Sequence, residues 1–215
     1  MHHCNSRFMS AIRWLTLLPL LWLAGCSLSP QPDNDNLVEL APGVRITLPS
    51  PAEYGGSLSA SQLIRISWQQ EGKAQTRTLP VQLQITPQKL ALAGFSSWGS
   101  RILSLTYENG QITTAVLPGL GDTLPKPEQV ALNLMLTLWP ISAWDKALAG
   151  TGWQLQQQGL SRQLLSPEGL PMIRIDYSAA DKLAGPISFR DNALGLTITI
   201  TTLSQGADHD SSQSH

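Results

Sequence analysis

Hydrophobic and polar residues alternate along much of the chain, and this period of two predicts β-strands. Apolar side chains occupy every second position in six segments, with Arg, Gln, Ser or Thr between them; the segments are 44–48, 64–68, 81–85, 103–107, 173–177 and 196–200. Such alternation places one face of a strand on a core and the other in water, as in an antiparallel sheet.

Turn signals separate the predicted strands. Asn109-Gly110 accepts the positive φ angles of a type I′ hairpin turn. Turns are also expected at 86–88 and 167–169, where proline is followed by polar residues or glycine. Residues 94–99 resemble a nucleophile elbow only superficially, because the second glycine comes one position too late, and we interpret them as a strand end and turn.

One segment has a different pattern and predicts a helix over 127–139. Proline lies in its first turn and Pro140 follows its end. Gln129, Asn133 and Thr137 form one polar stripe, and a helix that is apolar elsewhere must be covered on several sides. A short second helix with a capping-box-like start at Ser142 is expected to end near Gly150. These features predict an α+β fold, in which a curved antiparallel sheet, an incomplete β-barrel, is closed by one long and one short helix.

The N-terminal residues have the pattern of a signal peptide. Arg7 and Arg13 precede an apolar run at 14–23, which is too short for a bilayer span of ~20 residues. Leu23-Ala24-Gly25-Cys26 is similar to a bacterial lipobox. The resemblance implies cleavage after residue 25, a covalent N-terminal lipid on Cys26 and, because Ser27 is not aspartate, an outer-membrane location facing the periplasm. The alternative is an ordinary signal peptide with a chance cysteine.

The remaining chain divides by composition. We expect an acylated tether at 26–36, a single domain at 37–203 and a disordered tail at 204–215. Without residues 1–25 the chain has 12 Lys and Arg (14 − 2) against 15 Asp and Glu, which disfavours nucleic acid as a partner. The expected membrane contact is the lipid anchor.

Few residues are candidates for catalysis. All four histidines lie near the termini, at positions 2, 3, 209 and 215, and Cys26 is the only cysteine after cleavage. We therefore expect no catalytic residues, no metal site and no cofactor other than the lipid on Cys26. An enzyme that uses carboxylates alone is a minor alternative, although Asp176 is better explained by a surface ion pair with Arg174.

Apolar volume is the remaining candidate for function, because a curved sheet with helices can enclose a ligand cavity. The ligand-lining candidates come from the helical region, and plain core packing is the alternative for each of them. They are Leu134, Met135, Leu138, Trp139 and Trp144.

Several blocks resemble an uncharacterised proteobacterial lipoprotein family, a domain of unknown function often found in aryl polyene biosynthesis gene clusters. The most specific blocks are Leu138-Trp139-Pro140 with Ala143-Trp144, and Arg174-Ile175-Asp176-Tyr177. A distant fold analogy links the element order to the Lol lipoprotein carrier and acceptor proteins. The resemblance implies no established function. From the apolar volume and the lipid anchor we expect a non-enzymatic, outer-membrane-anchored lipoprotein that binds or hands over a hydrophobic acyl or polyene lipid. The alternative is a structural accessory lipoprotein that docks on an envelope protein.

Overall fold

A computed structural model describes residues 37–118 and 126–206. Ten strands form one antiparallel sheet in the order β7-β6-β5-β4-β3-β12-β11-β10-β9-β8, and β1 and β2 form a separate hairpin. In the large sheet the strands are β3 (Leu58–Gln70), β4 (Lys73–Ile85), β5 (Lys89–Phe95), β6 (Arg101–Glu108), β7 (Gln111–Val116), β8 (Gln154–Gln158), β9 (Ser161–Leu165), β10 (Pro171–Tyr177), β11 (Ile187–Asp191) and β12 (Leu196–Gly206). Strands β7 and β8 are its two edges.

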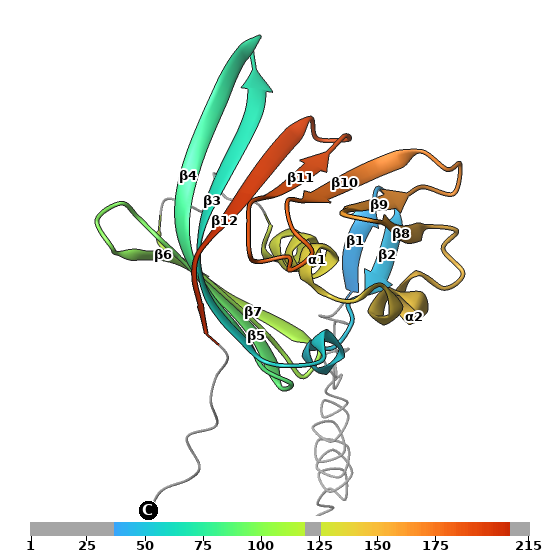
Figure 1. Cartoon of the computed structure of the whole chain (residues 1–215), viewed down its shortest axis with the longest axis horizontal. Coiled ribbons are helices and arrows are strands. Elements are labelled where there is room, and N and C mark those ends of the chain that lie inside the picture. The colour runs from blue at the N-terminus through green and yellow to red at the C-terminus, as the bar shows by residue number, and fades with distance from the viewer. Residues whose placement is uncertain (1–36, 119–125, 207–215) are drawn as a thin grey trace, which may run out of the picture. The chain divides into compact units, whose positions relative to one another are not determined.

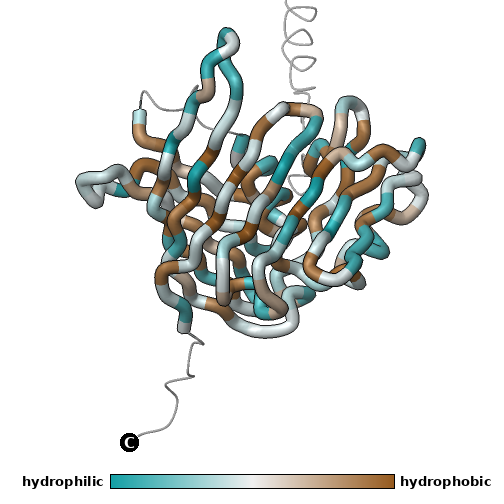
Figure 2. The backbone as a smooth tube through the Cα atoms, turned by 45° about the horizontal axis from the view of Figure 1, so that its top comes forward, coloured by the Kyte–Doolittle hydropathy of each residue, from teal (hydrophilic) through white to brown (hydrophobic). Residues whose placement is uncertain are grey.

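The sheet curves (Figure 1). Its inner face carries most of the core. The alternation predicted from the sequence is visible along the strands in Figure 2. Leu83, Leu105 and Ile175, for example, are almost fully buried on this face, while their chain neighbours are more exposed. Asn109 and Gly110 have φ angles of 52° and 77°, which confirms the predicted hairpin turn.

Helix α1 (Pro127–Leu138) packs between two layers. Its residues Leu132, Met135 and Leu136 are fully buried in a core that also contains inner-face residues of the sheet. The hairpin of β1 (Leu37–Ala41) and β2 (Val44–Thr47) contributes Val38, Leu40 and Ile46 to the same core, Leu48 directly after it does so too, and β1 contacts α1. The expectation that this helix is covered on several sides is therefore confirmed.

Two short helical segments complete the fold. A 3-10 helix, η2 (Pro51–Tyr54), follows β2, and its Ser50 and Glu53 form a capping box. After Pro140 the chain forms the 3-10 helix η4 (Ile141–Trp144) and the helix α2 (Asp145–Leu148). The capping-box-like start predicted at Ser142 is wrong, because the turn begins directly after Pro140 with no side-chain cap.

The predicted open, curved antiparallel sheet with two helices is thus present. Because β7 and β8 do not pair in the described chain, the sheet remains an open half-barrel. The further expectation that the two helices close this half-barrel stays a prediction.

Candidate functional site

The inner face of the sheet continues beyond the core as a half-buried apolar surface. Side chains of β3, β4 and β12 face one another there in register: Ile64 is opposite Leu79 on β4, while Ile66 and Trp68 are opposite Ile198 and Leu196 on β12. All of them are intermediate in exposure. We call these residues the inner strip: Ile64, Ile66, Trp68, Leu79, Leu196 and Ile198.

The inner strip begins where the core ends. Ile64, Leu79 and Ile198 still pack against the core, whereas Ile66, Trp68 and Leu196 lie outside it. Gly94 on β5 provides room at this boundary, because a Cβ atom there would approach Leu79 Cδ2 to 3.0 Å. In Figure 1 the long strands β3 and β4 extend well past α1. The apolar surface is therefore not explained by packing on that helix.

A charged side chain lies beside the inner strip. Arg77 is on the inner face of β4, directly opposite Ile66, and is exposed. The next inner-face residue towards the end of the hairpin is Gln75, opposite Trp68. The site therefore combines an apolar surface with one cationic group at its margin.

The structure places the five predicted ligand-lining residues in or next to the core. Met135 and Trp139 are completely buried, and Leu134, Leu138 and Trp144 are at most 8% exposed. Leu138 and Trp144 each contribute to the wall of a surface pocket. None of the five belongs to the inner strip. Cys26, the predicted lipidation site, lies outside the described residues.

The two tryptophans among these five residues differ in how their indole N–H groups are satisfied. Trp139 Nε1 donates to the carbonyl of Ser50 at 3.0 Å, and the ring packs on Tyr54 with centroids 5.2 Å apart. Trp144 Nε1 is buried without a partner among the described atoms. Trp139 therefore ties α1 to the segment after β2, and Trp144 acts as apolar volume.

Three side chains hold the C-terminal end of α1, where Pro140 prevents further helical hydrogen bonds. Arg162 Nη1 donates to the carbonyls of Leu136 and Trp139, at 2.6 and 2.8 Å. Tyr177 Oη donates to Thr137 O at 2.6 Å, and Lys182 Nζ donates to Leu138 O at 2.8 Å. We call Arg162, Tyr177 and Lys182 the C-terminal clamp of α1.

The clamp holds two cationic side chains, Arg162 and Lys182, in a partly desolvated environment. Arg162 is 1% exposed, and both Arg162 and Lys182 lie within 6 Å of the centre of the Tyr177 ring. Burial raises the pKa of Tyr177 to about 12. Burial, with the charge of Arg162, lowers the pKa of Lys182 to about 8. The partial negative charge at a helix C-terminus favours these cations.

The C-terminal clamp was not predicted from the sequence, although the sequence contains one indication of it. Arg162 stands two residues before Leu164, at a position of β9 that alternation assigns to the core face. A charged residue in an apolar register is rarely buried without partners. Here the partners are carbonyls more than 20 residues away in the chain, together with Gln157 Oε1.

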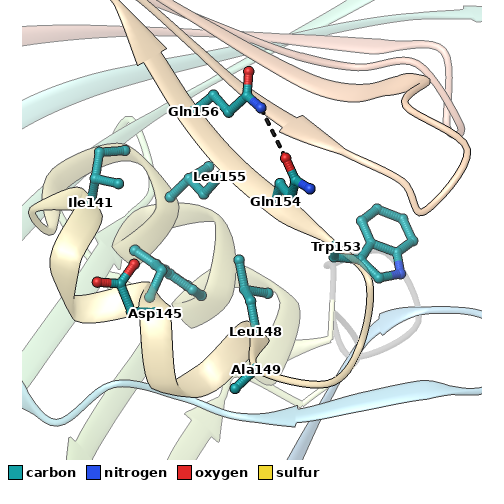
Figure 3. A pocket seen from close by; sticks show the side chains of 9 residues that line it. Ile141, Asp145, Leu148, Ala149, Trp153, Gln154, Leu155 and Gln156 are labelled. Atoms are coloured by element: carbon teal, nitrogen blue, oxygen red, sulfur yellow. Dashed lines mark hydrogen bonds between the residues drawn. The ribbon is translucent and has the colours of Figure 1, made fainter.

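The surface of the described chain includes the following open pockets. One of about 350 Å³ lies between α2 and β8, and Figure 3 shows its walls. A second, of about 270 Å³, lies between the β1–β2 turn and the β11–β12 turn, and Trp153 borders both. The third, of about 480 Å³, lies beside Lys182 and the loop at Gly55 and Gly56. The third pocket also has Tyr54, Ser57 and Asp181 in its wall.

The expected surface ion pair is confirmed. Arg174 Nε lies 3.0 Å from Asp176 Oδ1, and Arg190 Nη1 lies 3.1 Å from the other carboxylate oxygen. The hydrogen bond from Arg174 is the main cause that lowers the pKa of Asp176. In the ranges 37–118 and 126–206 there is no group of three metal-ligating side chains. No helix in those ranges is long and apolar enough to cross a membrane.

The fold thus defines a class: a half-barrel with an open sheet and an apolar inner face. Residues 59–204, more than half of the chain, match the family described as a protein of unknown function (DUF3261), and the chain belongs to this family. The chain is not significantly similar in sequence to any curated protein.

Solved structures show only remote likeness. A LolA superfamily protein from Nitrosomonas europaea aligns with a TM-score of 0.42 and 11% identity, over 74% of this chain and 91% of that one. A DUF1329 family protein from Desulfovibrio piger aligns with a TM-score of 0.35 and 8% identity, over 76% and 95%.

Proposed function

We propose that this chain is a non-enzymatic lipoprotein that binds or hands over a lipid with a linear acyl or polyene chain. The inner strip is the observation that carries the proposal. Its residues continue the core register of β3, β4 and β12 but stay half-buried, and three of them lie outside the core. Removing such surface from water contributes roughly 25 cal/mol per Å². A bound hydrocarbon chain would provide the missing cover.

The long axis of the strip suits a linear hydrocarbon chain. Ile64, Ile66 and Trp68 follow one another along β3 with two-residue spacing, which corresponds to a rise of ~7 Å between successive side chains. Arg77 beside Ile66 is placed to pair with a carboxylate or phosphate headgroup. The five predicted ligand-lining residues would contribute indirectly, because they form part of the core against which the inner strip packs. They are Leu134, Met135, Leu138, Trp139 and Trp144.

The membrane context of the proposal comes from the sequence. Acylated Cys26, followed by the tether 26–36, would hold the domain at the periplasmic face of the outer membrane. One acyl chain gives only marginal membrane binding, so stable anchoring would rest on the multiple chains of a lipoprotein N-terminus. The association with aryl polyene gene clusters stays a prediction.

Binding of cis-parinaric acid, a fluorescent polyene fatty acid, tests the proposal. The protein is the chain from residue 26 with Cys26→Ser, and energy transfer from tryptophan reports the bound probe. Ile66→Glu places a charge in the inner strip and should weaken binding at least ~10-fold. Thr76→Glu, on the exposed outer face of the same hairpin, is the matched control and should bind like the parent protein.

Two results would contradict the proposal. The first is absence of saturable binding by a folded protein, and the second is equal loss of binding in both variants. Native mass spectrometry of the same protein from its own host then identifies any co-purified lipid. A hydrocarbon species that is present in the parent and absent from Ile66→Glu would name the class of ligand.

A further inference from the structure

Strand β8 forms an edge of the large sheet and has an unpaired side. Within the described residues it pairs only with β9. Edge strands are commonly protected by lysine, proline, a bulge or a covering element, because their free N–H and C=O groups can pair with another chain. The sequence of β8, Gln-Leu-Gln-Gln-Gln, contains neither charge nor proline, and its pairing with β9 has no register shift.

The hairpin register shows which backbone groups are free. A two-residue turn, Gly159-Leu160, joins Gln158 to its partner Ser161, so these two residues form a hydrogen-bonded pair. By the alternation of an antiparallel ladder, Gln156 and Gln154 also bond to β9. The N–H and C=O groups of Leu155 and Gln157 therefore point away from the sheet.

The pocket of about 350 Å³ lies at this edge. Gln154 and Gln156 project from the outer face of β8 and Leu155 from the inner face, yet all three line the pocket (Figure 3). Residues of both faces can line one pocket only where it opens along the edge of the strand. The opposite wall includes Ile141 and Trp144 of η4, and Asp145 and Leu148 of α2.

The chemistry of the pocket selects its occupant. Ile141, Leu148 and Leu155 suit an apolar side chain, and the exposed carboxylate of Asp145 makes no ion pair with any described residue. The segments 27–36 and 204–215 of the chain carry aspartates but no lysine or arginine, so they match Asp145 poorly. The β8 strand of a second copy has only exposed glutamines to offer, because its Leu155 is buried.

We propose that β8 and this pocket bind an extended segment of a partner protein as an additional antiparallel strand. Its backbone pairs with Leu155 and Gln157, an apolar side chain enters the pocket, and a lysine or arginine two residues away pairs with Asp145. In strand addition the main-chain bonds give affinity and the pocket gives specificity. This interaction is independent of lipid on the inner strip.

The probe is the acetylated heptapeptide amide Thr-Lys-Thr-Leu-Thr-Lys-Thr, titrated into the full chain in dodecyl maltoside micelles. Replacing its leucine by alanine should weaken binding about 10-fold. Asp145→Lys should weaken it about fivefold or more, whereas Lys146→Glu, the adjacent exposed control, should not. Asp145 is exposed, so the variant is expected to fold.

Two further measurements test whether the peptide backbone pairs with β8. Hydrogen exchange should slow at Leu155 and Gln157 upon binding and stay unchanged at Gln156. Of two peptides methylated on alternating backbone nitrogens, one should lose binding and the other keep it. The proposal is overturned by absence of binding, by protection along β7 instead of β8, by tolerance of both methylated peptides, or by a dimer that forms through β8 without peptide. Parinaric acid binding should persist in Asp145→Lys, which separates this proposal from lipid binding.

Discussion

The inner face of the sheet has two regions with the same alternation of apolar and polar residues, but the two regions differ in burial. In the region next to α1, residues such as Leu83, Leu105 and Ile175 are at most 2% exposed. In the inner strip, Ile66, Trp68 and Leu196 have the same alternation but are half-buried and lie outside the core. The difference shows that alternation selects a face of the sheet, while long-range contacts decide whether that face becomes core or stays half-exposed.

The C-terminal clamp holds α1 on the first region, and its loss should have the largest effect. Arg162→Met leaves the carbonyls of Leu136 and Trp139 without a partner in a buried place. We expect a loss of about 4 kcal/mol in the free energy of unfolding, measured by urea denaturation. Arg174→Met removes a half-exposed arginine of a surface ion pair from the neighbouring strand and should leave the urea midpoint nearly unchanged. Equal effects of both changes would show that the clamp does not hold the helix.

Truncation of one apolar residue in each region tests the comparison itself. Leu105→Ala creates a cavity in the core and should cost about 3 kcal/mol. Ile66→Ala removes a partly hydrated side chain and should cost about 1 kcal/mol or less. Thermal unfolding of both variants measures the difference. A cost for Ile66→Ala as large as that for Leu105→Ala would make the inner strip part of the core and remove the basis for a lipid site.

The smallest effect concerns pH. The pKa of Lys182 is lowered to about 8 in the folded protein, from 10.5 when unperturbed. Between these values the unfolded chain binds more protons than the folded one, so stability should rise with pH through this window. Burial raises the pKa of Tyr177 to about 12, so its ionisation in the unfolded chain opposes the trend above about pH 10.

Urea midpoints at pH 7.5 and 9.5 measure this dependence. The rise is expected to be below ~1 kcal/mol, because Lys182 keeps partial contact with water. Lys182→Met should abolish the lysine contribution to the slope. A slope that survives in this variant would assign the pH dependence to another group.

Much of the architecture could be predicted from local pattern. The strands around 44–48, 64–68, 81–85, 103–107, 173–177 and 196–200 appear where alternation placed them, and the turn at Asn109-Gly110 has the expected positive φ angles. The helix begins at Pro127 and ends before Pro140, as the prolines predicted. The hairpin of β8 and β9 was not predicted, because glutamines dominate β8 and conceal the alternation.

The candidate site was predicted less well than the fold. The apolar character of α1 indicated burial, and the helix is buried, but the hairpin of β1 and β2 covers it together with the sheet. The half-buried surface lies instead on β3, β4 and β12. The residues of β12 are more than 100 positions from those of β3 and β4 in the chain. Cys26 lies outside the described residues, and its lipidation stays a prediction.

The sequence by itself determined which residues share a face, where turns occur and where the helix stops, because these features follow from periods of two and 3.6 residues and from proline and glycine geometry. Only the tertiary structure decided what covers each face. Arg162 holds the end of α1 because it donates hydrogen bonds to carbonyls 23 and 26 residues away. Likewise, Tyr107 donates a hydrogen bond to the carbonyl of Leu48, 59 residues away. Local pattern contains no information about such partners, since they come together only when distant strands pair and pack.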